Sequence, residues 1–406
     1  MAVRITGSQK STTLEIPRSL NGANAVAQAM RQTNPHVVAA YPITPSTIIV
    51  EAFSQFVANG EVDTEFVAVE SEHSAMSACV GAAAAGGRVQ TVTTSQGLAL
   101  MWEMLYIASG MRLPIVLHAT NRAISAPLNI HCDHSDTMGA RDSGWIQLYA
   151  EDAQEAYDNA LMAVRIAEDP EVVLPVMHSQ DGYTVSHSTE RVLLLPDDVA
   201  QGFLGEYQAR NPLLDTAHPI SLGAMFSPQY LFELKHQQEV AMVAAEGVIV
   251  RVGHEFACLS GRYRGLTEGY RLEDADYVLV GIGSMIGTAR VVVDQLREEG
   301  VRAGLLKIRC YRPFPEGDIV AALAGRKAVA VLDRALSYGS SGNPLYSDLC
   351  TTLFKRGISQ KVVGYAYGIG GRDPVPSQIR QVFRELMEVA ERETEGAPIR
   401  YLGLRE

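Results

Sequence analysis

Short apolar runs alternate along most of the chain with stretches in which apolar residues recur every three or four positions, or in which alanine predominates. The short runs predict β-strands and the longer stretches predict helices. Strands that alternate with helices are typical of a parallel sheet with helices on both faces. Asn21 is the expected N-cap of the first helix. In the first half of the chain, the pattern predicts strands at 37–41, 66–69, 89–93, 114–118 and 172–177, and helices at 22–31, 72–85, 95–104 and 153–166.

The alternation weakens after the middle of the chain and returns in the last third. Residues 196–274 contain scattered prolines and glycines without a clear period, and we expect a long irregular excursion and linker there. Strands are predicted again at 277–280, 303–308, 328–332 and 362–365, with a helix at 288–299. We therefore predict an α/β protein with a first domain at 1–255, a linker at 256–274, a smaller domain at 275–385 and a charged tail at 386–406.

Length and charge narrow the class of protein. The chain has 406 residues, 47% of them hydrophobic, which is enough for two well-packed α/β domains. Its net charge is −12 and it has no basic cluster, so nucleic acid and membranes are not expected as partners. The first eight residues lack the apolar segment of a signal peptide, and no apolar run is long enough to cross a bilayer. We expect a cytoplasmic protein.

The cysteines also argue against a metal cluster held by this chain alone. Five are present, they lie far apart, and none belongs to a Cys-x-x-Cys pair. An odd, scattered set is typical of reduced thiols in a cytosol. The five are Cys79, Cys132, Cys258, Cys310 and Cys350.

Four polar residues directly follow predicted strands. They are Thr44, Glu72, Ser95 and Arg122. Because the carboxyl ends of parallel strands meet at one edge of a sheet, and ligands bind there in α/β proteins, we expect these residues to face one crevice. This expectation depends only on the order of the predicted elements.

Each of these residues also has an ordinary structural interpretation. Two prolines stiffen the turn Tyr41-Pro-Ile-Thr-Pro-Ser46 and could hold the Thr44 hydroxyl toward a substrate oxygen, but Thr44 or Ser46 could equally be a helix N-cap. Glu70 and Glu72 could both be solvated carboxylates at a helix start, or one of them could bind a ring nitrogen in the crevice.

Arg122 offers a planar pair of donors that is suited to a carboxylate ligand. The alternative is a structural ion pair with one of the many acidic residues. The segment His131-Cys-Asp-His-Ser-Asp136 has metal-binding residue types, but its spacing matches no standard zinc motif. We interpret it as a turn in which Asp133 or Asp136 caps the next helix.

Two glycine motifs are not assigned to phosphate binding. Gly281-Ile-Gly-Ser-Met-Ile-Gly287 has one residue too many for the dinucleotide fingerprint, and we interpret it as a tight strand–helix turn. Asp181-Gly182 is similar to part of a Gly-Asp-Gly magnesium motif, but Gln180 replaces the first glycine, so no metal is predicted there.

Together, several motifs resemble the α subunit of pyruvate:ferredoxin oxidoreductase, in the 2-oxoacid:ferredoxin oxidoreductase superfamily. The resemblance covers nearly the whole chain and is weakest at 196–274. The motifs are Tyr41-Pro-Ile-Thr-Pro-Ser46, Glu70-Ser-Glu72, Thr94-Ser-Gln-Gly97, Asn121-Arg-Ala123 with Asp133-His-Ser-Asp136, and Arg309-Cys-Tyr-Arg-Pro-Phe314.

The resemblance implies a domain that binds the pyrimidine of thiamine diphosphate, followed by a domain similar to the transketolase C-terminal domain. It also implies three catalytic residues. Thr44 and Arg122 bind the 2-oxoacid, and Glu72, rather than Glu70, contacts the aminopyrimidine. In such enzymes a glutamate on the ring nitrogen N1′ favours the imino tautomer of the cofactor.

The implied reaction is the reversible oxidative decarboxylation of pyruvate with coenzyme A to acetyl-CoA and CO₂, with electrons passing to ferredoxin; in reverse it fixes CO₂ in anaerobic metabolism. The resemblance places the diphosphate and Mg²⁺ on a β subunit. It places the [4Fe–4S] clusters in partner subunits, which include a γ subunit, a ferredoxin-like δ subunit or both. Open alternatives are 2-oxoisovalerate, 2-oxobutyrate or oxalate as substrate, a non-catalytic scaffold subunit, and a cluster-free thiamine enzyme.

Overall fold

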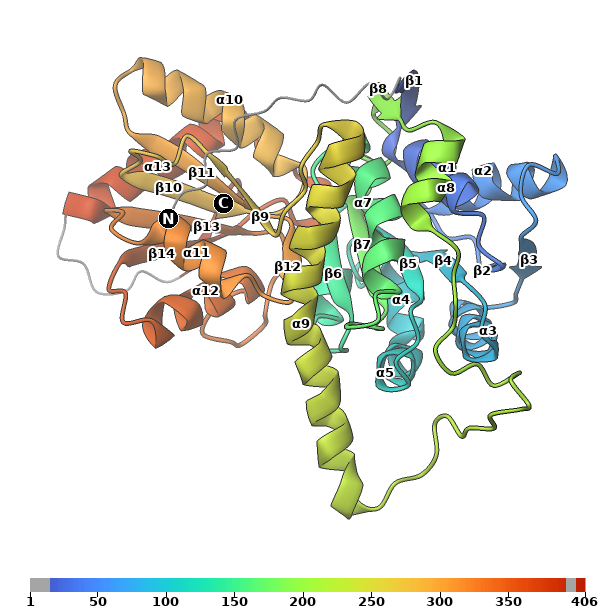
Figure 1. Cartoon of the computed structure of the whole chain (residues 1–406). Helices are drawn as coiled ribbons and strands as arrows, with labels where there is room; N and C mark the ends of the chain where they lie inside the picture. Colours follow the sequence, from blue (N-terminus) through green and yellow to red (C-terminus); the bar gives the residue numbers. More distant parts are fainter. Residues whose placement is uncertain (1–14, 392–398, 406) are drawn as a thin grey trace.

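The computed structural model describes residues 15–391 and 399–405. Two sheets, each covered by helices, lie side by side, and a short ribbon of β1 (Ile16–Asn21) and β8 (Thr189–Leu194) flanks the first (Figure 1). The predicted α/β class with two units is confirmed. The eight residues tested for a signal peptide, and part of the expected 386–406 tail, lie outside the described residues.

The first sheet has seven strands in the order β12-β6-β7-β5-β4-β2-β3. All neighbours are parallel except β12, which is antiparallel to β6. The chain adds β3 on one side of β2 and β4 on the other, so the strand order reverses at β2. The strands are β2 (Val37–Ala40), β3 (Glu65–Ala68), β4 (Val89–Thr93), β5 (Val116–Asn121), β6 (Ile146–Ala150), β7 (Val176–Asp181) and β12 (Cys310–Arg312). In sheets of this type, ligands bind at the reversal point.

Helices cover both faces of this sheet. One face packs against α1, α2, α7, α8 and part of α9, and the other against α3, α4 and α5. As predicted, Asn21 caps α1, because its side chain accepts a hydrogen bond from the Asn24 amide at 2.8 Å. The helices are α1 (Gly22–Thr33), α2 (Thr47–Ala58), α3 (Glu72–Ala85), α4 (Ser95–Leu100), α5 (Trp102–Gly110), α6 (Ser135–Gly139), α7 (Ala153–Ala167) and α8 (Asp197–Leu204).

The second sheet has six strands in the order β15-β14-β13-β10-β11-β9, parallel except at β9. Its order reverses at β10, between β11 and β13. The strands are β9 (Thr267–Tyr270), β10 (Tyr277–Gly281), β11 (Ala303–Ile308), β13 (Ala328–Asp333), β14 (Lys361–Ala366) and β15 (Arg400–Tyr401). The helices are α10 (Met285–Glu298), α11 (Glu316–Leu323), α12 (Pro344–Lys355), the 3₁₀ helix η1 (Ile369–Gly371) and α13 (Pro376–Glu391).

The long helix α9 corrects the expectation of an irregular stretch at 196–274. It runs for 33 residues, Pro228–Ser260, and its amino-terminal half projects from the body (Figure 1). Its buried residues begin at Ala241, so the helical period of apolar residues is clear only in the second half. Residues 205–227 contain no helix or strand, as expected.

The expected linker and tail contribute regular structure rather than free connections. Helix α9 continues through position 255 to Ser260, and β9 pairs with β11. Helix α13 extends to Glu391, and β15 adds to the edge of the second sheet beside β14. The expected linker at 256–274 and the expected tail at 386–406 therefore each include parts of helices and strands that pack with the two sheets.

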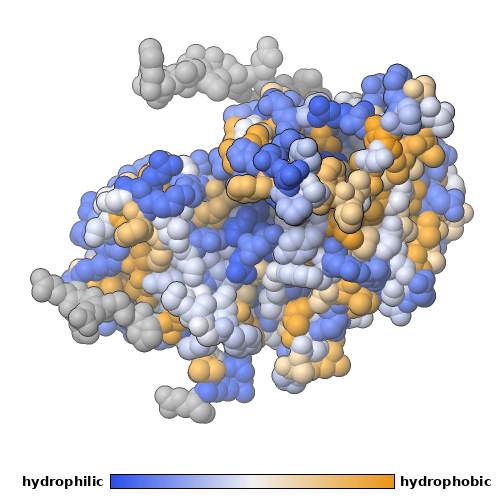
Figure 2. Space-filling view, turned by 90° about the horizontal axis from the view of Figure 1, so that it is seen from below, coloured by the Kyte–Doolittle hydropathy of each residue, from blue (hydrophilic) through white to orange (hydrophobic). Residues whose placement is uncertain are grey.

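The projecting end of α9 carries many exposed apolar side chains. Tyr230, Leu231 and Phe232 are 61%, 51% and 80% exposed. This end points toward the viewer in Figure 2, where apolar and polar residues are mixed on the same face. Exposed apolar side chains at this density are typical of a surface that another chain covers. Among the described residues, no helix has both the length and the hydropathy that a membrane span requires.

Candidate active site

The loops after β2, β4 and β5 and the start of α3 meet at the carboxyl edge of the first sheet. The Arg122 guanidinium contacts both the Thr44 loop and Gln96, and Gly97 packs against the Glu72 carboxylate. The structure therefore brings Thr44, Glu72 and Arg122 together at the point where the strand order reverses. Ser95 is fully buried, and its neighbours Gln96 and Gly97 make these contacts instead.

Arg122 is buried without a counter-ion. It is 7% exposed, and in the described part of the chain its guanidinium takes part in no ion pair. Three oxygens hold it: Nη1 donates to the Thr44 carbonyl at 2.7 Å, Nη2 to Gln96 Oε1 at 3.3 Å, and Nε to the Asn129 carbonyl at 3.3 Å. These neutral acceptors orient the cation without cancelling its charge. The structural ion pair considered as an alternative is absent among the described residues.

The Thr44 turn does not serve as a side-chain cap. Ser46 occupies the N-cap position of α2, but its side chain makes no capping hydrogen bond, and its hydroxyl donates to the Ile43 carbonyl at 2.7 Å. Thr44 is exposed, and within the described residues its hydroxyl has no hydrogen-bond partner. The hydroxyl is therefore available to a ligand next to Arg122.

The two glutamates of the Glu70-Ser-Glu72 segment have different environments. Glu70 is exposed, and a 2.5 Å hydrogen bond from the Ser74 hydroxyl lowers the pKa of its carboxyl group. Glu72 begins α3 directly after the N-cap Ser71 and is only 7% exposed. No hydrogen bond or ion pair between described residues involves its carboxylate. The pair that the sequence could not separate is thus divided into a solvated member and a buried member with free acceptor oxygens.

Gly97 allows the start of α4 to approach Glu72. A Cβ atom at this position would lie 2.7 Å from Glu72 Oε1 and 2.4 Å from Thr93 Oγ1, which is too close for any side chain. No role was predicted for this glycine from the sequence. The signal was its place in the Thr94-Ser-Gln-Gly motif, directly after a predicted strand.

Asp136 connects the start of α4, which carries Gln96, with the loop that carries Arg122. Its carboxylate accepts hydrogen bonds from the backbone amides of Ser95 at 3.1 Å and Arg122 at 3.0 Å, and from the Asn121 side chain at 2.9 Å. Burial raises the pKa of Asp136 to about 6 despite these donors. The prediction that Asp133 or Asp136 caps α6 is wrong, because His134 is the N-cap and makes no side-chain capping hydrogen bond. Asp133 accepts the Ser135 amide at 3.0 Å, and Asp136 mainly bonds residues that are distant in the sequence.

A second buried cluster joins the two sheets. Asp181, at the end of β7, lies 2.7 Å from both His134 Nε2 and Arg334 Nη1, and it accepts the Ser284 hydroxyl at 2.6 Å. Burial alone would raise the pKa of the Asp181 carboxyl, but the charges of His134 and Arg334 outweigh it and hold that pKa well below its usual range. Asp181 thus fills the reversal point of the second sheet, where a Cβ on Gly283 would lie 2.9 Å from its carboxylate.

The same cluster brings Cys132, His134 and Asp181 within metal-ligand distance of one another. The oxygens of Asp181 are already occupied by a guanidinium, a hydroxyl and an imidazole, and the positive charge of Arg334 opposes a cation at this position. The donor set therefore fits an interdomain ion pair better than a metal site.

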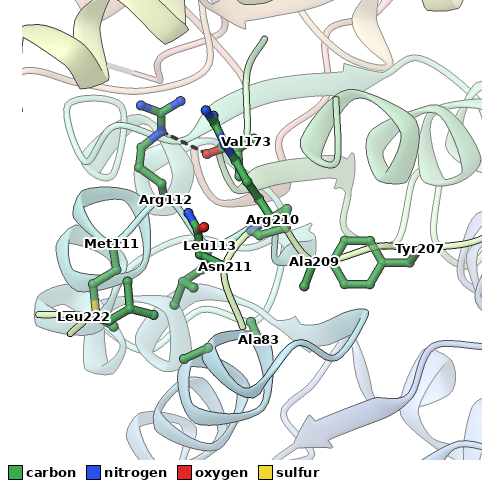
Figure 3. Close-up of a pocket in the computed structure, with 12 residues that line it drawn as sticks. Ala83, Met111, Arg112, Leu113, Val173, Tyr207, Ala209, Arg210, Asn211 and Leu222 are labelled. Carbon is green, nitrogen blue, oxygen red and sulfur yellow. Dashed lines mark hydrogen bonds between the residues drawn. The ribbon is translucent and has the colours of Figure 1, made fainter. Parts of the chain in front are cut away.

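Among the cavities that the described residues form, two stand out by their arginines or by their position. One, of about 230 Å³, is lined by Arg112, Leu113, Val173 and Arg210 at the amino ends of β5 and β7 (Figure 3). Its lining contains no carboxylate, and Arg112 Nε donates to the Val173 carbonyl at 3.0 Å. The other, of about 350 Å³, adjoins the Arg122 loop and is lined by residues that include Ile124, Asn129 and Tyr338. Neither contains Glu72.

Comparisons with known proteins agree with the fold. Residues 28–253 match the family model described as pyruvate flavodoxin/ferredoxin oxidoreductase, thiamine diphosphate-binding, and residues 275–379 match the model of pyruvate:ferredoxin oxidoreductase core domain II. The chain is 51% identical to pyruvate synthase subunit PorA of Thermotoga maritima, covering 96% of this chain and 98% of the relative.

Two further relatives also match nearly all of the chain. Pyruvate synthase subunit PorA of Methanocaldococcus jannaschii is 46% identical, covering 90% of this chain and 94% of the relative. Ketoisovalerate oxidoreductase subunit VorA of Pyrococcus horikoshii is 41% identical, covering 93% and 95%.

Two solved structures share the fold. A 2-oxoglutarate:ferredoxin oxidoreductase from Magnetococcus marinus aligns with a TM-score of 0.71 at 20% identity, covering 93% of this chain, which spans 65% of that one. A split-gene transketolase aligns with a TM-score of 0.52 at 15% identity, covering 92% and 97%. Because a family model covers more than half of the chain and curated relatives match nearly all of it, the chain belongs to the pyruvate:ferredoxin oxidoreductase family of 2-oxoacid oxidoreductase subunits.

Proposed function

We propose that this chain is the α subunit of a pyruvate:ferredoxin oxidoreductase. The complex converts pyruvate and coenzyme A to acetyl-CoA and CO₂, passes the electrons to ferredoxin, and also runs in reverse. The observation that carries the proposal is Glu72, a buried carboxylate with free acceptor oxygens beside Gly97, in the same crevice as Arg122 and Thr44.

Glu72 fits the pyrimidine of thiamine diphosphate. A carboxylate with free acceptor oxygens and little exposure can hold the proton of a ring nitrogen in a hydrogen bond that water weakens little. Bound thiamine diphosphate supplies the electron sink that the decarboxylation needs. The role of Glu72 is to orient the ring and to hold the proton at its nitrogen.

Arg122 and Thr44 fit the 2-oxoacid. Three of the five guanidinium N–H groups are used by carbonyl oxygens, which leaves two for a substrate carboxylate. The hydrogen bond from Arg122 to the Thr44 carbonyl keeps the Thr44 hydroxyl beside this cation. The substrate would therefore meet a charged donor and a hydroxyl that are fixed before it binds.

Partner subunits complete the site. We assign the diphosphate and Mg²⁺ to a β subunit, because this chain has no Gly-Asp-Gly motif. We assign the [4Fe–4S] clusters to a ferredoxin-like δ subunit, a γ subunit or both, because the five cysteines are dispersed and Cys79, Cys132 and Cys310 are buried. The apolar end of α9 is a candidate contact surface for such a partner. We also propose that the complex is cytoplasmic.

Rates with different 2-oxoacids test the substrate. The purified complex should form acetyl-CoA from pyruvate and coenzyme A, reduce ferredoxin, and prefer pyruvate to 2-oxobutyrate, 2-oxoisovalerate and oxalate. A preference for 2-oxoisovalerate would support the alternative substrate instead. One relative, 41% identical, is a ketoisovalerate oxidoreductase subunit from Pyrococcus horikoshii. An active complex without iron would refute the transfer of electrons to ferredoxin.

A further inference from the structure

Gln96 provides one of the three oxygens that hold the Arg122 guanidinium. The other two are backbone carbonyls, of Thr44 and Asn129. In the described part of the chain, Gln96 is therefore the single side chain that hydrogen-bonds this guanidinium. Arginine can only donate, so the atom of Gln96 that faces it is the carbonyl oxygen, and the orientation of the amide is fixed.

Two features show that the contact between Gln96 and Arg122 is accompanied by unfavourable local structure, which is an unpaired buried nitrogen and a strained backbone. The Nε2 atom of Gln96 is buried and has no hydrogen-bond partner among the described residues, although buried amide donors are normally paired. Ser95, directly before it, has a positive φ of 48°, which residues with a side chain rarely adopt. The Asp136 carboxylate accepts the Ser95 amide at 3.1 Å and helps to hold this conformation. Unpaired and strained groups of this kind cluster at functional sites.

The chemical type of residue 96 also matters. A carboxylate here would hold the guanidinium equally well, but it would neutralise the charge that a 2-oxoacid needs. An amide oxygen orients the cation and leaves that charge intact. We propose that Gln96 is a positioning residue, which fixes Arg122 for the substrate carboxylate while keeping it unpaired. The proposal rests on the proposed function, because it takes Arg122 as the group that binds the 2-oxoacid.

Two substitutions in the complete complex separate orientation from charge. Gln96→Met removes the acceptor while nearly keeping the volume, and Gln96→Glu keeps an acceptor but adds a negative charge. We expect KM for pyruvate to rise about 10-fold with Gln96→Met and about 10²-fold with Gln96→Glu, with a smaller change in kcat. Dissociation constants for the phosphonate analogue of pyruvate, measured by calorimetry, should follow the same order, and the affinity for thiamine diphosphate should not change.

Gln28→Glu is the matched control. Gln28 is also partly buried, and its Oε1 also accepts from an arginine, Arg31 Nε at 3.1 Å, but it lies on α1 away from the crevice. The Gln28→Glu variant should have a KM for pyruvate within about twofold of the wild-type value. The inference is overturned if both Gln96 variants bind pyruvate and its analogue like wild type, or if Gln96→Glu binds them more tightly than Gln96→Met. A weaker affinity for thiamine diphosphate, with the analogue unaffected, would also overturn it. If wild type itself does not oxidise pyruvate, the proposed function fails instead.

Discussion

Arg122 Nη1 lies 2.7 Å from the carbonyl oxygen of Thr44, and this contact joins the loops after β5 and β2. The two strands flank β4, so the bond spans the point where the strand order reverses. Both proposed substrate contacts are thereby held in one geometry before a ligand binds. A preorganised pair avoids the entropy cost of ordering two separate loops around the substrate.

Arg122→Lys tests this relationship. Lysine keeps the positive charge but cannot bond the Thr44 carbonyl, Gln96 and a substrate carboxylate at the same time, because it lacks the planar fork. We expect KM for pyruvate to rise about 10- to 10²-fold, which corresponds to the loss of one or two charge-assisted hydrogen bonds. Steady-state kinetics on the complex measure this. Arg18→Lys on the exposed strand β1 should leave KM unchanged, and an unchanged KM in Arg122→Lys would contradict the assignment.

Glu72→Gln removes the carboxylate but keeps the shape of the side chain. We expect the rate to fall at least about 10²-fold, in the range found when one preorganised catalytic contact is removed. The fold should be retained, because no hydrogen bond within the described structure depends on this carboxylate. Glu70→Gln is the control, since Glu70 is exposed and, among the described residues, Ser74 is the hydrogen-bond partner of its side chain. Near-normal turnover of Glu72→Gln would favour the scaffold alternative.

Gly97→Ala should displace Glu72 without changing its chemistry. The added Cβ would lie 2.7 Å from Glu72 Oε1 and 2.4 Å from Thr93 Oγ1, so one of these groups must move. We expect a loss of about 1–3 kcal/mol of stability and a fall in activity similar to that of Glu72→Gln. Gly81→Ala, in the same sheet-covering helix layer, has nothing within 4 Å of the new atom and should be tolerated. Thermal midpoints and turnover of both variants test this. Wild-type stability and turnover in Gly97→Ala would contradict the prediction.

Asp136 should make stability depend on pH. Burial raises its pKa to about 6 from a value of 3.8 in the unfolded chain, so the folded state binds more protons between these values. The contribution is fully present below about pH 4 and is lost as the pH rises through about 6, by up to about 3 kcal/mol. In Asp136→Asn, the decrease in the free energy of unfolding across this window should be smaller than in wild type. Equal pH slopes in urea titrations would contradict the assignment.

The edge of the first sheet could be predicted because it depends on local patterns. Alternating apolar runs located strands close to β2, β3, β4 and β5, and any residue directly after a parallel strand reaches the same edge. Thr44, Glu72 and Arg122 were found in this way, and the choice of Glu72 over Glu70 needed the resemblance. The structure supplies the physical difference, which is the burial of one carboxylate and the exposure of the other.

What could not be predicted depends on contacts between distant segments. Asp136 orders Ser95, 41 positions earlier, and no local pattern indicates that bond. Asp181 meets Arg334, 153 positions later, so a residue that was compared with a magnesium motif is instead an interdomain contact. Helix α9 was missed as a whole. Its first half packs against little of the body, and an exposed helix lacks the apolar period that identifies buried helices.

Replacing Arg334, the ion-pair partner of Asp181, should strongly lower the stability of the fold. It is 3% exposed and lies 2.7 Å from the Asp181 carboxylate, which is fully buried. Arg334→Met would leave a buried negative charge with His134 as its remaining ionisable partner, so we expect a loss of about 3–5 kcal/mol in the free energy of unfolding. Adding Asp181→Asn removes that charge, and the double variant should regain part of the loss. Urea midpoints of wild type, both single variants and the double variant complete the cycle. A double variant whose loss equals the sum of the two single losses would mean that the pair is not coupled, and that the two sheets are held together by other contacts.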